Sequence, residues 1–175
     1  MRRFLLMLFL AACCAPNHVF SQLVKHQTQT SPVADTVPLY RKYPTIPAFP
    51  LYTVDNKPFD KSRLKKNKPT VVFIFSVECD HCRIMTEEIQ KNIAKFSNSQ
   101  ILMITPFKVD RMKEYYDEFK IGNYKNITMV SEPTRQIMRF YDLHYFPGVY
   151  IYDKKQSYTK GWEGGVKLET LLANL

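Results

Sequence analysis

Two cysteines separated by two residues stand between a segment that predicts a buried strand and one that predicts a helix. Residues 70–75 are a continuous run of β-branched and aromatic residues, which is typical of a strand buried on both faces in a parallel sheet. After Cys79 and Cys82, apolar residues recur at helical spacing from Met85 to Phe96. The chain therefore combines strands and helices around this Cys-x-x-Cys motif.

The rest of the sequence alternates between the same two kinds of element. Besides a small hairpin at 49–59, the apolar patterns predict strands at 101–105, 127–130, 148–152 and 156–162. Further helices are expected at 110–121, 131–141 and 168–175. This order implies an α/β fold with a parallel core and an antiparallel C-terminal hairpin. At 175 residues, one domain accounts for the chain.

The N-terminus has the features of an export signal. Two arginines precede an apolar run over 4–14, which is shorter than the about 20 residues of a membrane-spanning helix but fits a secretory signal peptide. Cleavage after Ser21 would make 1–21 the signal peptide. Alternatively, Leu-Ala-Ala before Cys13 resembles a bacterial lipobox, and a lipidated Cys13 would anchor the protein to a membrane. In both cases we expect a periplasmic or otherwise extracytoplasmic protein.

Two further features bear on domains and partners. Residues 22–45 are rich in Gln, Thr, Ser and Pro, so we expect a flexible linker there and one domain over 46–175. The net charge of +9 comes from 25 lysines and arginines that are spread along the chain. We therefore expect no nucleic-acid partner, and we expect a monomer.

Export determines how the cysteines are interpreted, because a cysteine pair outside the cytoplasm tends to be a disulfide for part of the time. Cys13 and Cys14 lie in the signal segment, so only Cys79 and Cys82 are certain to remain. At positions i and i+3 of a first helical turn, two cysteines are close enough to form a disulfide. The unpaired N–H groups of that turn favour an anion, so we expect Cys79 to attack as a thiolate and Cys82 to resolve the mixed disulfide.

The residues around Cys79 have opposing effects on the stability of its thiolate. His81 can donate a hydrogen bond to the thiolate, and its imidazolium would stabilise it further, whereas Glu78 and Asp80 oppose it by charge repulsion. The alternative interpretation of His81 is an exposed polar residue at a helix start. The sequence leaves the balance of these effects open.

Two alternatives to a redox role for the cysteine pair were weighed. Structural zinc needs about four ligands, and His18, His26 and His144 are not spaced to complete such a site. An inert structural disulfide fits the position between a strand and a helix less well than catalysis does. We therefore expect no metal and no cofactor beyond a redox-active Cys79–Cys82 disulfide.

Two segments make the sequence resemble thioredoxin-fold proteins. The first runs through the strand and cysteines at 70–82, and the second spans 141–153. The spacing between them resembles the exported TlpA/ResA-like branch, also called redoxin or AhpC/TSA-type domains. The resemblance implies a central mixed sheet flanked by helices, with an N-terminal hairpin and an extra strand-helix unit before a cis-proline at Pro147. In that family the proline faces the disulfide, and Phe146 and Asp80 are then expected to contact substrate.

The sequence departs from the thioredoxin pattern at three positions. Phe73 stands where many thioredoxins have a buried acid, so proton transfer to or from Cys82 must use another group or water. Glu78 replaces the common Trp before the first cysteine, and Gly148 replaces the usual Thr after the proline. These departures affect rate and partner choice more than reaction type.

The function expected from these observations is an extracytoplasmic thiol-disulfide oxidoreductase. Its partners would be protein thiols or disulfides and an upstream thiol-disulfide electron donor. A thiol peroxidase is an alternative, because Ser76 fits the peroxiredoxin pattern, although Val72 stands where its proline should be. A third possibility is a non-enzymatic Cu(I)-handling module, in which His144 would join the two thiolates. The sequence does not distinguish a reductant from an oxidant or an isomerase.

Overall fold

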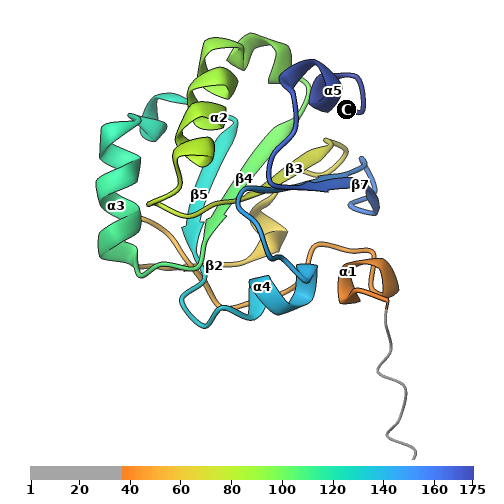
Figure 1. Cartoon of the computed structure of the whole chain (residues 1–175), viewed down its shortest axis with the longest axis horizontal. Coiled ribbons are helices and arrows are strands. Elements are labelled where there is room, and N and C mark those ends of the chain that lie inside the picture. Colours follow the sequence, from red (N-terminus) through yellow and green to blue (C-terminus); the bar gives the residue numbers. More distant parts are fainter. Residues whose placement is uncertain (1–36) are drawn as a thin grey trace, which may run out of the picture. The chain divides into compact units, whose positions relative to one another are not determined.

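The computed structural model describes residues 37–175, which form a seven-stranded mixed sheet with helices on both faces (Figure 1). The strands, in the spatial order β2-β1-β5-β4-β3-β6-β7, are β1 Leu51–Tyr52, β2 Pro58–Phe59, β3 Thr70–Ile74, β4 Gln100–Thr105, β5 Ile127–Ser131, β6 Gly148–Tyr152 and β7 Tyr158–Glu163. The α-helices are α1 Leu39–Lys42, α2 Asp80–Lys91, α3 Val109–Glu118, α4 Gln136–Tyr141 and α5 Leu168–Leu172. Short 3-10 turns lie at Lys61–Arg63, Ile93–Phe96 and Ile121–Asn123.

The pairing of the strands agrees with the predicted fold class. β4 pairs in parallel with both β3 and β5, whereas β6 runs antiparallel to β3, and β7 antiparallel to β6. The predicted N-terminal hairpin is formed by β1 and β2, and β1 joins the sheet antiparallel to β5. Between Cys82 and Pro147 the chain makes two strand-helix units, β4-α3 and β5-α4. The expected mixed sheet with its extra unit is therefore confirmed.

The two faces of the sheet carry separate sets of helices (Figure 1). Val71 and Phe73 of β3 pack in a core cluster with residues of α2, α3 and α5. Val72 and Ile74 of the same strand pack in a second cluster with α4 and with Tyr40 of α1. All four side chains are fully buried, as expected for a central strand whose alternating residues face two layers. β3 is therefore buried between two packed layers, and α2, which follows it, belongs to one of them.

Helix α2 is shorter than the apolar stripe predicted. Met85 and Ile89 face the core at helical spacing, but the helix ends at Lys91, and Asn92 donates a side-chain hydrogen bond to the Glu88 carbonyl at 3.0 Å. The stripe continues to Phe96 as a 3-10 turn. The apolar residues of the stripe face the core as predicted, but the last of them lie in a 3-10 turn and not in the α-helix.

The domain begins earlier than predicted. Tyr40 of α1 stacks on Tyr141 of α4, with ring centroids 5.6 Å apart, and Thr45 forms an isolated antiparallel bridge with Ser157. Residues 37–45 were expected to belong to the linker, because a four-residue helix is too short to display an amphipathic period. They belong instead to the packed domain.

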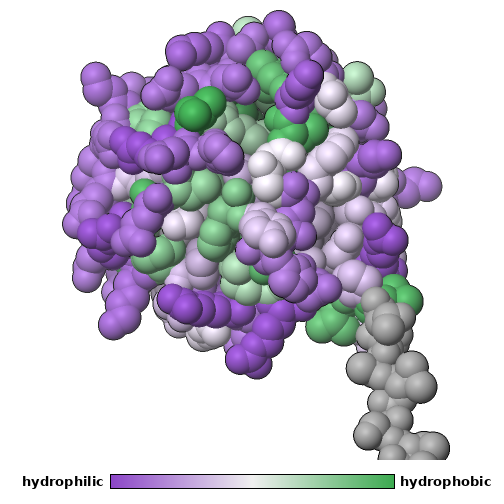
Figure 2. All heavy atoms as spheres, in the orientation of Figure 1, coloured by the Kyte–Doolittle hydropathy of each residue, from purple (hydrophilic) through white to green (hydrophobic). Residues whose placement is uncertain are grey.

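The predictions for the N-terminus lie mostly outside the described residues. These are the signal peptide over 1–21, the lipidation of Cys13 and the linker up to residue 36, and they stay predictions. Within 37–175, no helix has the length and apolar character needed to cross a bilayer. Where the described chain begins, Val37 and Leu39 expose 48% and 43% of their surface, and Figure 2 shows hydrophobic atoms on the surface around α1.

Candidate active site

The first cysteine of the motif caps the helix that follows it. Cys79 has extended backbone angles, and its Sγ accepts a hydrogen bond from the backbone N–H of Cys82 at 3.2 Å. Sulfur thus takes the place of the side-chain oxygen that usually caps a helix. The side chain is half-buried and is in the reduced state. This sulfur is therefore partly open to solvent and receives a hydrogen bond that favours negative charge.

The second cysteine is sealed inside the protein. Cys82 has no exposed surface and belongs to the core cluster under α2. Burial, followed by the hydrogen bond with Cys79, raises the pKa of the Cys82 thiol well above its usual value, although the backbone of Ser76 acts in the opposite direction. Cys82 is therefore a neutral thiol at physiological pH. The two sulfurs therefore differ in access to solvent, because Cys79 is half-buried and Cys82 is fully buried.

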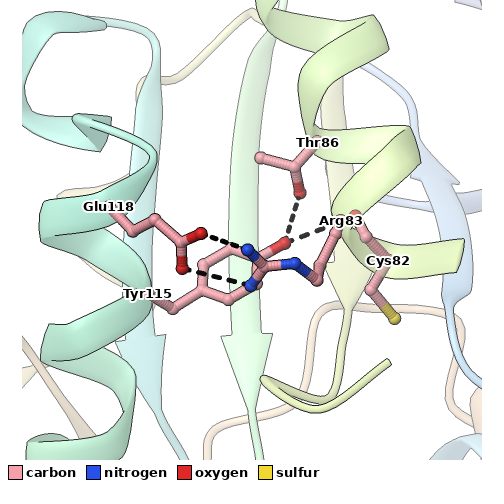
Figure 3. Close-up of polar contacts among 5 residues, drawn as sticks. All are labelled: Cys82, Arg83, Thr86, Tyr115 and Glu118. Carbon is pink, nitrogen blue, oxygen red and sulfur yellow. Dashed lines mark hydrogen bonds and ion pairs between the residues drawn. The ribbon is translucent and has the colours of Figure 1, made fainter. Parts of the chain in front are cut away.

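A buried hydrogen-bond network from α3 reaches the second cysteine (Figure 3). The Tyr115 hydroxyl donates to the Cys82 carbonyl at 3.3 Å and lies 2.8 Å from the Thr86 hydroxyl. Since Tyr115 has only one proton to donate, Thr86 must be the donor in the second bond. Both side chains are at most 2% exposed, and burial raises the pKa of Tyr115, so its hydroxyl stays neutral. This network ties the first turn of α2 to α3.

Two ion pairs at the surface join α3 to α2 and to the segment just before α2. Arg83, the residue after Cys82, binds both carboxylate oxygens of Glu118 (Figure 3), and its guanidinium lies 5.0 Å from the ring centroid of Phe119. Glu78 pairs with Arg111 of α3 at 3.1 Å. Exposed pairs of this kind each stabilise a fold little. The Arg111 charge nevertheless offsets that of Glu78, one of the two acids expected to oppose a thiolate at Cys79.

The predicted cis-proline lies in a groove beside the start of α2. The peptide bond between Phe146 and Pro147 is cis, as the resemblance implied. Pro147 and His81 line the same groove of about 310 Å³, whose other walls include Ile84, Glu88, Gly165 and Lys167. The backbone N–H of Gly165 donates to the Pro147 carbonyl at 3.0 Å, which holds the turn after β7 against the proline loop.

The other predicted site residues are placed as follows. Phe146 is half-buried and packs against both core clusters, so it bridges the two layers next to the proline. Asp80 is exposed as the first residue of α2 and is not among the walls of the groove. The structure thus brings His81 and Pro147 to one groove at the start of α2, and leaves Asp80 at its edge. The roles of all six residues stay predictions.

Phe73, Ser76 and His144, which the sequence also singled out, lie outside the groove that holds Pro147 and His81. Phe73 is fully buried and stacks on Phe75 at 5.9 Å, so a ring occupies the place of the missing acid. Ser76 is buried, and its hydroxyl accepts a hydrogen bond from the Glu78 N–H at 3.2 Å. His144 is exposed and lies 3.7 Å from Glu163. Among residues 37–175, no three His, Cys, Asp or Glu side chains gather as a metal site would require, so His144 does not join the cysteines.

The sequence analysis missed the residues of α3 that support the motif. Tyr115 lies 33 positions from Cys82 along the chain, and Glu118 lies 35 from Arg83. The sequence predicted a helix over 110–121, but no sequence pattern indicates which backbone carbonyl the Tyr115 hydroxyl contacts. Arg83 was visible beside the motif, yet its partner depends on how α2 and α3 pack.

A larger cavity lies away from the cysteines. It has a volume of about 380 Å³, and its walls include Ile46, Lys61, Lys65 and Gln156. The Gln156 side chain accepts a hydrogen bond from Thr70 at 3.0 Å, and Thr70 begins the strand whose other end leads to Cys79. The cavity therefore lies at the opposite end of β3 from the motif, and volume alone does not make it the reaction site.

Comparison with known proteins agrees with the fold. The model of the AhpC/TSA family matches residues 44–158. The pneumococcal exposed lipoprotein thioredoxin Etrx1 is 20% identical, with a TM-score of 0.56, over 74% of this chain and 100% of its own. A secreted Mycobacterium tuberculosis disulfide oxidoreductase homologous to Escherichia coli DsbE is 18% identical, with a TM-score of 0.59, over 73% of this chain and 93% of its own. Copper-bound ScoI of Arabidopsis thaliana is 16% identical, with a TM-score of 0.58, over 73% of this chain and 92% of its own. None of the curated proteins compared matches the chain.

Proposed function

The chain belongs to the AhpC/TSA family, and from that premise we propose that it is an extracytoplasmic thiol-disulfide oxidoreductase. Family membership supports an oxidoreductase-type enzyme in general. The finer proposal is that it exchanges electrons with cysteines of other proteins through a mixed disulfide at Cys79. The observation that carries it is the contrast between the two sulfurs: Cys79 is half-buried and hydrogen-bonded to an amide, whereas Cys82 is fully buried and neutral.

The proposed reaction has two exchange steps. The Cys79 thiolate attacks a substrate disulfide, so a Cys79–substrate bond forms, the substrate S–S bond breaks, and the departing sulfur takes up a proton. Cys82 then loses its proton and attacks the Cys79 sulfur, which forms the Cys79–Cys82 disulfide and releases the second substrate thiol. Two electrons pass from the protein dithiol to the substrate. The reverse sequence oxidises a substrate dithiol.

The surroundings of the motif suit a protein substrate. The groove that holds Pro147 and His81 is open, and it lies beside Ile84, which exposes 56% of its surface. Tyr145, two residues before the proline, is 72% exposed. We propose that a substrate segment lies along Phe146 and Pro147 in this groove, with Asp80 and His81 at its edge. An upstream thiol-disulfide donor would then return Cys79 and Cys82 to the reduced state.

Trapping the mixed disulfide tests the proposal. A Cys82→Ser variant, mixed in its reduced form with insulin as a disulfide-containing substrate, is expected to accumulate a covalent adduct that dithiothreitol releases. Non-reducing gels and mass spectrometry detect the adduct and locate it at Cys79. The matched Cys79→Ser variant keeps only the buried thiol of the motif, Cys82, and is expected to form no adduct at the motif. Absence of an adduct with Cys82→Ser, or equal adducts with both variants, would contradict the mechanism.

Further measurements on the reduced wild-type protein separate the alternatives. A reduction potential of the cysteine pair near about −270 mV would identify a reductant, and one near about −120 mV an oxidant. Consumption of hydrogen peroxide at a catalytic rate would favour a peroxidase instead, despite Val72 in place of proline. Stoichiometric retention of Cu(I) against a competing chelator, with negligible disulfide exchange, would favour a copper-handling module.

A further inference from the structure

A third pocket lies on the face of the sheet opposite the cysteines. It has a volume of about 260 Å³, and its walls include Tyr40 of α1, Tyr141 of α4 and Tyr150 of β6. Tyr150 packs in the core cluster under α4, whereas its neighbour Val149 packs in the cluster that contains Cys82. Successive residues of a strand point to opposite faces, so this pocket and the motif are on different sides of β6.

The hydroxyl of Tyr150 is the unusual feature of this pocket. The side chain is only 3% exposed, and within residues 37–175 its hydroxyl has no hydrogen-bond partner. Every fully enclosed side-chain polar atom in the same part of the chain does have one. The Tyr150 hydroxyl is therefore not fully enclosed, and the side chain lines the pocket. A ligand that displaces solvent from this hydroxyl can supply a hydrogen bond that the protein does not.

Two glycines let the Tyr150 ring reach this position. A Cβ at Gly161, its cross-strand partner, would lie 2.5 Å from the ring, and one at Gly148 would lie 2.9 Å from it. Contacts that short are not tolerated, so the ring occupies space that only glycine leaves free. The ring is also fixed by Tyr40 and Tyr141, whose centroids lie 5.3 Å and 4.1 Å away. The hydroxyl is thus held in a defined place without a partner of its own.

The other polar walls include two acids and a histidine, His144. Asp142 and Glu163 both line the pocket, in a protein whose net charge is +9. Glu163 Oε1 accepts hydrogen bonds from the backbone N–H groups of His144 and Tyr145, whereas its Oε2 has no hydrogen-bond partner within residues 37–175. Burial, nearby tyrosines and the Glu163 charge raise the pKa of Tyr150, so its hydroxyl remains neutral. The pocket therefore offers a neutral hydroxyl and two carboxylates, all of which can accept hydrogen bonds.

We propose that this pocket binds an organic cation, a primary ammonium or a guanidinium, between the Tyr150 hydroxyl and the carboxylates of Asp142 and Glu163. The tyrosine walls suit the alkyl part of such a ligand, and aromatic rings also attract cations. The chain provides a precedent, because the Arg41 guanidinium lies 5.7 Å from the ring centroid of Tyr40. The donors in residues 37–175 do not gather as a metal site would require, which favours an organic cation over a metal ion.

The proposed organic cation has two sources: a free small molecule, or a lysine or arginine side chain of a bound polypeptide. The proposal does not depend on the redox activity, because the pocket lies on the other side of the strand from the cysteines. His144 also lines the pocket and lies 3.7 Å from both Asp142 and Glu163.

The test titrates the full-length protein with butylammonium, with a Gly-Lys-Gly peptide blocked at both ends, and with the same peptide carrying norleucine in place of lysine. Binding is followed by calorimetry and by the backbone NMR signals of Gly161 and Glu163. We expect the lysine peptide or the amine to bind and the uncharged norleucine peptide to bind at least about fivefold more weakly. Binding of the amine alone identifies a small-molecule source, and tighter binding of the peptide a polypeptide source.

Variants distinguish the pocket from general charge attraction. Tyr150→Phe removes only the hydroxyl and is expected to weaken binding at least about fivefold, the effect of one lost hydrogen bond to a charged group. Asp142→Asn is expected to weaken it similarly. Tyr145→Phe is the matched control, because Tyr145 is exposed and outside the pocket walls. No binding of either charged probe below about 10 mM, or equal affinities for Tyr150→Phe and the wild type, would overturn the proposal.

Discussion

The sharpest prediction concerns the hydroxyl that links α3 to Cys82. Replacing Tyr115 by Phe keeps the ring, which packs against Phe75 with centroids 4.7 Å apart, and removes only the oxygen. That oxygen donates to the Cys82 carbonyl and accepts from Thr86, so two buried hydrogen bonds are lost and the Thr86 hydroxyl loses its acceptor. At about 0.5–1.5 kcal/mol for each bond, the free energy of unfolding should fall by about 1–3 kcal/mol.

Urea denaturation of the reduced protein, followed by circular dichroism, measures this change. Tyr116→Phe is the matched control, because Tyr116 lies next in α3, is half-buried, and its hydroxyl has no hydrogen bond within the described residues. The control should change stability by less than about 0.5 kcal/mol. In a double-mutant cycle, Thr86→Val should couple to Tyr115→Phe by at least about 0.5 kcal/mol, because both variants break one shared bond. A Tyr115→Phe protein as stable as the control would refute this account of the network.

Three further predictions follow from other buried groups. Glu132 is fully buried and accepts two backbone N–H groups around the start of α4, at 3.1 and 3.0 Å, so Glu132→Ala should lower the free energy of unfolding by about 2–4 kcal/mol, measured with urea. Gly161→Ala would place a methyl group 2.5 Å from the Tyr150 ring and should cost about 1–3 kcal/mol, visible as a lower Tm; an unchanged Tm would contradict that crowding. Burial raises the pKa of Tyr150 and Tyr152 in the folded protein, so above about pH 10 these tyrosines ionise in the unfolded chain but not in the folded one. The free energy of unfolding should therefore fall above about pH 10 by about 1.4 kcal/mol per pH unit for each tyrosine. Unfolding measured between about pH 8 and pH 11 should therefore be less steeply pH-dependent in Tyr152→Phe than in the wild type.

The local parts of the site could be predicted from the sequence. The run before Cys79 gave β3, because a central strand must be apolar on both faces, and the spacing after Cys82 gave the start of α2. The cis bond before Pro147 was implied by resemblance alone, since no propensity distinguishes that proline from the others. These features depend on neighbours in the chain, or on a known pattern.

The supporting contacts could not be predicted in the same way. Arg111 and Glu78 are 33 positions apart, and they meet only because α3 packs beside α2. The docking of α1 depends on the stacking of Tyr40 with Tyr141, two residues about a hundred positions apart that carry no shared pattern. The replacement of the thioredoxin acid by Phe73 was visible in the sequence, but the hydrogen bond from Tyr115 to the Cys82 carbonyl depends on how α2 and α3 pack. Contacts between residues far apart in the sequence therefore depend on how the helices pack on the sheet.

The hydrogen bond from the Cys82 amide to the Cys79 sulfur makes one atom both a structural cap and a redox group. If the proposed chemistry holds, closing the disulfide removes the charge that the cap binds, so oxidation alters the stability of the helix itself. Folding and reduction then form a closed thermodynamic cycle, in which about 1.4 kcal/mol of extra stability in the reduced protein corresponds to about 30 mV of reduction potential. A calorimeter comparing the two redox forms would thus measure how strongly the fold drives electron uptake.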